Sequence, residues 1–83
     1  MKAKQPIQES QLAALAKQFR EASGKSKAEV ARELGVAAPT IFSAEERPEM
    51  SLTKLRIRMI EAYSPYEVIG AVYFLKRKGT PET

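Results

Sequence analysis

Residues 26–47 constrain the fold of this chain more than any other stretch, because their helix start and stop signals allow two short helices and a tight turn. Ser26 and Glu29 have the spacing of a capping box, in which each side chain accepts a hydrogen bond from a backbone N–H of the first helical turn. A helix is therefore predicted to begin at Lys27. Gly35 can adopt the left-handed conformation that ends a helix without steric cost, which places the turn there.

A second helix is predicted to follow this turn and to end before Pro48. Pro39 lies where that helix would begin, at a position whose backbone N–H has no partner within a helix. Ile41 and Ala44 are three residues apart and are expected to face inward together. Because the residue before a proline disfavours helical conformation, the helix should end near Arg47.

The side chain at the predicted crossing of the two helices, Ala31, is small enough for their axes to approach closely. The motif resembles the helix-turn-helix of the Cro-like, or XRE, family of repressors, over roughly residues 12–62. The resemblance rests on the spacing of Ala31, Gly35 and Ile41 and on the phrases Leu34-Gly35-Val36 and Pro39-Thr40-Ile41. It implies a DNA-binding fold whose second motif helix enters the major groove.

Two amphipathic segments flank this motif, so we predict a mostly α, four-helix Cro/repressor-like domain over residues 7–64. In residues 7–22 the apolar side chains recur at spacings of three and four: Leu12, Leu15, Ala16, Phe19 and Ala22. After a cap at Ser51, the predicted inward stripe consists of Leu52, Leu55, Met59, Ala62 and Tyr63. Ile57 and Ile60 widen this apolar face, which indicates that another element packs there. Residues 1–6 are predicted to form a flexible basic arm. We expect this arm to be a solvated chain end, and the alternative is that it contacts DNA.

Residues 65–79 are predicted to form a C-terminal dimerisation segment built on a β-strand. Residues 67–75 are rich in β-branched and aromatic side chains, although Ser64-Pro65-Tyr66-Glu67 has the form of a helix start and leaves a helix as the alternative. In a single strand, one face would carry Val68, Val72 and Phe74, and the other Ile69, Ala71, Tyr73 and Leu75. Because the chain offers no evident partner strand, we expect antiparallel pairing in a symmetric homodimer. The residues expected to mediate dimerisation are Val68, Ile69, Val72, Tyr73, Phe74 and Leu75.

The composition favours a nucleic-acid partner and argues against an enzyme. Lys and Arg outnumber Asp and Glu by 14 to 10, which gives a formal net charge of +4. The chain contains no Cys and no His, so the usual nucleophile, general-base and zinc-ligand arrangements are unavailable. We therefore expect no catalytic residue, no metal and no cofactor. No apolar run has transmembrane length and no signal-peptide pattern is present, so the expected location is the cytoplasm, without membrane contact.

The resemblance also implies which residues would meet DNA. The base-facing positions are Ala37, Ala38, Pro39, Ser43 and Glu46, with Phe42 at the margin. None of them is Arg, Gln or Asn, the side chains that bond bidentately to guanine or adenine, so direct readout should be weak. The expected phosphate contacts are Lys25, Lys27, Thr40, Arg47 and Lys54, of which Lys27 and Thr40 match contact positions of the family. Arg20 and Glu45 match the positions of a structural ion pair in the family, with two ordinary surface charges as the alternative.

Two functions are compatible with these features. The first is a homodimeric, sequence-specific transcriptional regulator of double-stranded DNA, a repressor, whose half-site centres would lie about one helical turn, ~34 Å, apart. The alternative is a protein-interaction module or an antitoxin-like protein that keeps the same fold and binds a protein partner through its apolar tail. The basic charge favours the first function, and the weak set of base-reading side chains favours the second.

Overall fold

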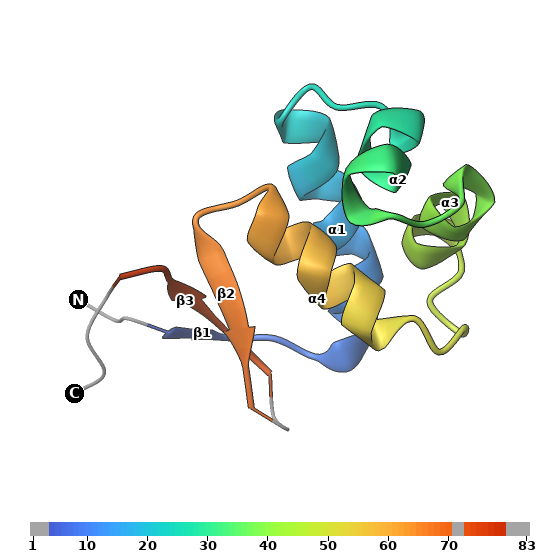
Figure 1. The fold of residues 1–83 in the computed structure, drawn as a ribbon. Helices are drawn as coiled ribbons and strands as arrows, with labels where there is room; N and C mark the ends of the chain where they lie inside the picture. Colours follow the sequence, from blue (N-terminus) through green and yellow to red (C-terminus); the bar gives the residue numbers. More distant parts are fainter. Residues whose placement is uncertain (1–3, 71–72, 80–83) are drawn as a thin grey trace.

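The computed structural model describes residues 4–70 and 73–79. Its elements in chain order are β1 (Lys4–Pro6), the 3-10 helix η1 (Glu9–Gln11), α1 (Leu12–Ala22), α2 (Lys27–Leu34), α3 (Ala38–Glu46), α4 (Thr53–Ala62), β2 (Tyr66–Ile69) and β3 (Phe74–Arg77). The four α-helices lie on one side of the molecule and a three-stranded sheet lies on the other (Figure 1). The prediction of a mostly helical chain is confirmed for the described residues.

The boundaries of α2 follow the local signals in the sequence. The Ser26 hydroxyl accepts a hydrogen bond from the Glu29 N–H at 3.0 Å, and the Glu29 carboxylate accepts one from the Ser26 N–H at 2.8 Å. Gly35 ends the helix in the left-handed conformation, with φ of 74°. The N–H of Val36 then donates to the carbonyl of Ala31 at 2.9 Å and closes the turn. The predicted capping box and glycine stop are therefore confirmed.

The start of α4 differs from the prediction. The residue that precedes its first turn is Leu52, and no side chain caps this end of the helix. Ser51 therefore lies one residue too early for its hydroxyl to serve as the helix cap, and the predicted cap at this residue is wrong. The Leu52 carbonyl instead accepts the first helical hydrogen bond, from the N–H of Arg56 at 3.0 Å.

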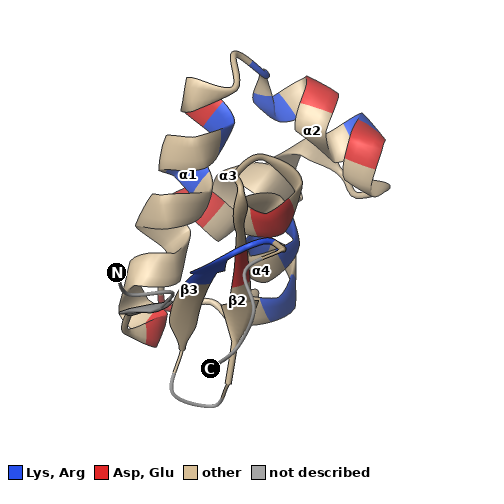
Figure 2. Ribbon diagram, turned by 90° about the vertical axis from the view of Figure 1, so that its left-hand side faces the viewer, with Lys and Arg blue, Asp and Glu red and all other residues tan. Residues whose placement is uncertain are grey.

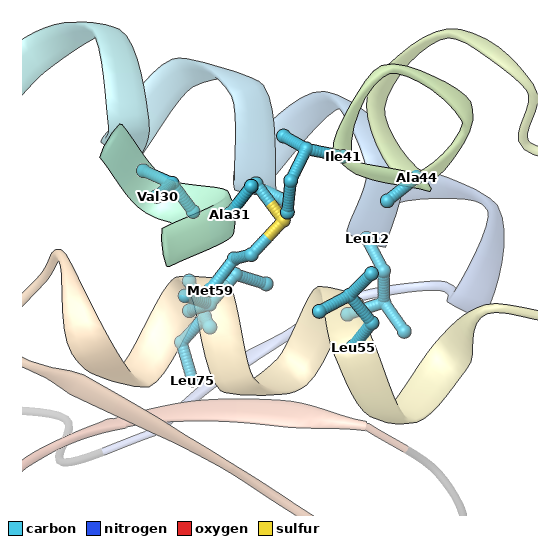
Figure 3. Packing of buried hydrophobic residues seen from close by; sticks show 10 residues of the cluster. Leu12, Val30, Ala31, Ile41, Ala44, Leu55, Met59 and Leu75 are labelled. Atoms are coloured by element: carbon cyan, nitrogen blue, oxygen red, sulfur yellow. The ribbon is translucent and has the colours of Figure 1, made fainter. Parts of the chain in front are cut away.

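The core lies where the helices and β3 meet. Leu12, Val30, Ile41, Met59 and Ile60 are completely buried and come from all four α-helices. Figure 3 shows the side chain of Met59 extending from α4 between residues of the other helices. Burial of one such side chain contributes roughly 1.5–3 kcal/mol relative to exposure, so these residues dominate the stability of a domain this small.

The predicted inward stripe of α4 is displaced around the helix. Ile60, expected beside the stripe, is completely buried, whereas Ala62, expected within it, is exposed. The reason is that a second layer packs on α4: β2 runs against this helix, and Leu75 of β3 joins the same core cluster. The element that the wide apolar face of α4 required is thus the chain's own sheet.

The C-terminal segment forms two strands, and both find their partners within the same chain. The sheet is antiparallel with the order β1-β3-β2, so β3 is central and has a neighbour on each side. The prediction that this segment lacks an in-chain partner is therefore wrong. The prediction of an arm without regular structure also fails for Lys4–Pro6, which form β1, while residues 1–3 lie outside the described part.

The turn of this hairpin also changes which side chains share a face. Val68 lies opposite Leu75, and Ile69 lies opposite Phe74. Directly opposed residues point to the same face of a sheet, and Leu75 is only 4% exposed in the core. Val68 and Leu75 therefore face inward, whereas Ile69 and Phe74 face outward. The single-strand alternation predicted above is wrong because the chain reverses after Gly70; Ala71 and Val72 lie outside the described residues.

We expect Leu75→Ala to lower the free energy of unfolding by about 2–5 kcal/mol, because it removes a core side chain from the sheet. Ile69→Ala, on the outward face, should cost clearly less. Urea denaturation followed by circular dichroism would measure both variants. Equal losses would contradict the assignment of the two faces.

Within residues 4–70 and 73–79, none of the helices combines the length and the apolar character needed to cross a membrane.

Candidate nucleic-acid interface

Helices α2 and α3 are joined by residues 35–37 and pack against each other. The inner face of α3 carries the buried residues Ile41, Ala44 and Glu45. Helix α3 also packs against α1 and α4, so it is in contact with all three other α-helices. The opposite face of α3 is directed to solvent, and its position relative to the rest of the molecule is fixed.

A buried ion pair connects α1 to α3. The guanidinium of Arg20 donates two hydrogen bonds to the Glu45 carboxylate, from Nε at 2.5 Å and from Nη2 at 3.1 Å. The side chains of Arg20 and Glu45 are 8% and 0% exposed, and Arg20 Nη1 also donates to the Lys25 carbonyl at 2.8 Å. The hydrogen bond to Glu45 raises the pKa of Arg20 above its usual value. The predicted pairing is thus confirmed, and it joins α1, α3 and the chain before α2.

A second buried arginine, which the sequence analysis missed, fixes the C-terminal end of α3. Arg56 of α4 is 3% exposed and donates to the carbonyls of Ala44, Arg47 and Met50 at 2.8, 2.7 and 2.9 Å. Burial lowers the pKa of Arg56 from its usual value. A cation at the C-terminal end of a helix interacts favourably with the helix dipole. The available signal was spacing, since Arg56 lies three residues before Met59 and four before Ile60, both on the inward face of α4.

The predicted base-facing residues lie on or beside the outer face of α3. Ala37, Ala38, Pro39 and Glu46 are exposed, while Ser43 is half-buried. Phe42, placed at the margin by the sequence analysis, is 48% exposed. The predicted residues therefore lie together on and beside α3. The N-terminal part of this helix exposes apolar side chains.

Two lysines from neighbouring helices border this face. Lys17 of α1 donates to the Glu46 carboxylate at 2.8 Å, and this hydrogen bond lowers the pKa of Glu46. The Nζ atom of Lys27 lies 6.0 Å from the centre of the Phe42 ring and 4.0 Å from Glu45 Oε1. The contact between Lys17 and Glu46 was not predicted, because the two residues lie 29 positions apart in the sequence.

The predicted phosphate-binding residues differ in their exposure and in whether a carboxylate of the same chain already pairs with them. Lys25 forms an ion pair with Glu33 at 2.6 Å, whereas Arg47 lies 4.0 Å from Glu49 and its side chain remains 58% exposed. Thr40 on α3 is half-buried, and Lys54 on α4 is exposed. Charges of both signs lie along α1 and α2, so the surface around α3 is mixed rather than uniformly basic (Figure 2). Lys27 and Arg47 each lie 4.0 Å from a carboxylate, so they are less tightly paired than Lys25.

Comparison with known proteins finds no match to this chain among protein families, curated proteins or solved structures. The geometry of α2 and α3 and the side chains around them therefore provide the structural basis for inferring a function.

We expect Glu45→Ala to lower the free energy of unfolding by about 3–5 kcal/mol, because it leaves Arg20 buried without its carboxylate. Glu46→Ala removes the adjacent carboxylate, whose pair with Lys17 is exposed, and should change stability little. Urea denaturation would compare the two variants. If Glu45→Ala is unfolded without urea, the isosteric Glu45→Gln takes its place, and losses equal to that of Glu46→Ala would contradict a structural role for the buried pair.

Proposed function

We propose that this protein is a sequence-specific DNA-binding transcriptional regulator, a repressor, that inserts α3 into the major groove of double-stranded DNA. The observation that carries the proposal is the exposed outer face of α3. The helix itself is packed against α1, α2 and α4. The resemblance of residues 12–62 to Cro-like repressors supports the same reading. A repressor of this kind acts by occupying its site, so it needs no catalytic group.

The surroundings of α3 supply the electrostatic part of this proposal. The major groove admits an α-helix, and the phosphates on either side of it attract cations. Lys27 lies near the start of α2 and Arg47 follows the end of α3, so the two cations flank the outer face. The half-buried Thr40 hydroxyl and the exposed Lys54 would add phosphate contacts, while Lys25 contributes less because it is paired with Glu33.

A homodimer remains part of the proposal, but through a different surface from the strand edge expected above. Strand β3 is flanked on both sides, and the N–H groups of Tyr66 and Val68 in the edge strand β2 already donate to Ser64 Oγ and Glu61 Oε2. The other edge strand contains Pro6, which has no N–H. The outward row of Pro6, Phe74 and Ile69 is therefore the better candidate interface.

The same apolar row favours a second candidate function, a module that binds a partner protein. Ile69 and Phe74 are half-buried in the single chain and lie opposite each other on the face directed away from the core. This candidate requires no contact between α3 and DNA. Charge removal beside α3 distinguishes the two functions.

We expect the double variant Lys27→Gln and Arg47→Gln to weaken DNA binding and to lower the slope of log affinity against log salt by about 2, one for each lost phosphate contact. Glutamine avoids placing a new carboxylate beside Glu45. Fluorescence anisotropy against a duplex from upstream of the protein's own gene, and against a scrambled duplex, would measure the effect at several salt concentrations.

The matched control is Arg77→Gln with Lys78→Gln, which changes the net charge equally at the sheet, on the other side of the molecule from α3 (Figure 1). The control should retain the salt slope of the unaltered protein. An equal loss of DNA affinity in both double variants would show that binding depends only on the net charge of the protein. An unaltered affinity in the first variant would favour the protein-binding function.

We expect Ile69→Glu to shift a dimer to a monomer in sedimentation equilibrium, because it buries a charge in the outward row. Met50→Glu adds the same charge at a residue that is 42% exposed in the α3–α4 connection and should leave the assembly unchanged. Dissociation by both variants, or by neither, would contradict an interface on this face of the sheet.

A further inference from the structure

We infer that α3 reads the C5-methyl group of a pyrimidine, in thymine or 5-methylcytosine, and not the hydrogen-bonding edge of a purine. The inference rests on the proposed function, because it names the chemical group that the same helix would recognise. Two observations support it. The side chains exposed at the N-terminal part of α3 are apolar, and the polar Glu46 further along the helix is already paired with Lys17.

The exposed N-terminal part of this face offers no polar side-chain atom. Ala37, Ala38 and Pro39 are all exposed, and none can donate or accept a hydrogen bond through its side chain. In helix-turn-helix docking, the N-terminal residues of the second helix are those that contact base edges. The residues placed to touch bases are therefore apolar.

The polar residues further along α3 are less suited to reading bases. The Glu46 carboxylate accepts a hydrogen bond from Lys17 Nζ at 2.8 Å, so a contact with cytosine N4 would compete with an existing ion pair. Ser43 is half-buried, and its hydroxyl can bond to several bases without selecting one. Neither residue gives the bidentate pattern that identifies a purine.

Phe42 extends the apolar surface. Ala38 and Phe42 are four residues apart and therefore neighbours on the same side of the helix. A single exposed aromatic side chain is ordinary on a protein surface, but Phe42 is 48% exposed and continues the apolar row of α3. Lys27 Nζ lies 6.0 Å from its ring centre, so a cation suited to phosphate stands beside the group suited to a methyl.

Alanine and phenylalanine contact the thymine methyl in the major groove, where uracil and cytosine present only hydrogen at C5. Loss of one buried methyl contact weakens binding roughly fourfold, equivalent to about 0.8 kcal/mol. Thymine and 5-methylcytosine carry this methyl at the same ring position, so both satisfy the proposed site.

The test begins with selection of bound duplexes from two random libraries, one with ordinary cytosine and one with 5-methylcytosine in its place. Enrichment of thymines in the ordinary library identifies thymine as the source of the methyl. Enrichment of cytosine positions only in the modified library identifies 5-methylcytosine. The selected duplex is then remade with deoxyuridine for each thymine, or cytosine for each 5-methylcytosine, and its affinity is measured by fluorescence anisotropy.

We expect roughly a fourfold loss of affinity for each contacted methyl that is removed. In Phe42→Ala, the difference in affinity between methylated and unmethylated duplexes should shrink. Met50→Ala, at an exposed large apolar side chain outside α3, should leave this difference unchanged. A selected duplex whose affinity is unchanged by methyl removal would overturn the inference and leave the proposed function standing. Failure to enrich any duplex from either library would overturn both.

Discussion

The position of α3 depends above all on the buried pair between Arg20 and Glu45. Taking both charges out of water is costly, and the two hydrogen bonds at 2.5 and 3.1 Å are what offset that cost. A rotation or shift of α3 would break both bonds and leave two buried charges. The pair therefore selects one orientation of α3, and with it the set of side chains that the opposite face presents to solvent.

Arg56 of α4 acts on the same, C-terminal end of α3 as the Arg20–Glu45 pair. Among the residues that the structure describes, no carboxylate is hydrogen-bonded to Arg56. Its guanidinium donates instead to three carbonyls from α3 and the connection to α4. A guanidinium suits this role because its donors point in several fixed directions at once. Two arginines from different helices thus fix the C-terminal end of α3, while the apolar core beneath it supplies most of the stability.

Local signals predicted the parts of the fold that depend on a few adjacent residues. Ser26 with Glu29, and Gly35, fixed the limits of α2 because capping and left-handed turns are decided within one turn of helix. The pairing of β1 with β3 joins opposite ends of the chain, and no local pattern encodes it. The hairpin was missed for a related reason: the point at which the chain reverses decides whether Val68 shares a face with Phe74 or with Leu75.

The candidate site was predictable in its membership but not in its electrostatics. The resemblance to Cro-like repressors placed Pro39 and Glu46 among the base-facing residues, yet it could not pair Glu46 with Lys17 from another helix. This pairing matters for the proposed DNA binding because an isolated carboxylate on that face would repel phosphate, whereas a carboxylate next to an ammonium group repels it much less. The pairing of Glu46 is therefore compatible with the proposed approach of α3 to DNA, and the inferred specificity rests on the apolar N-terminal part of α3.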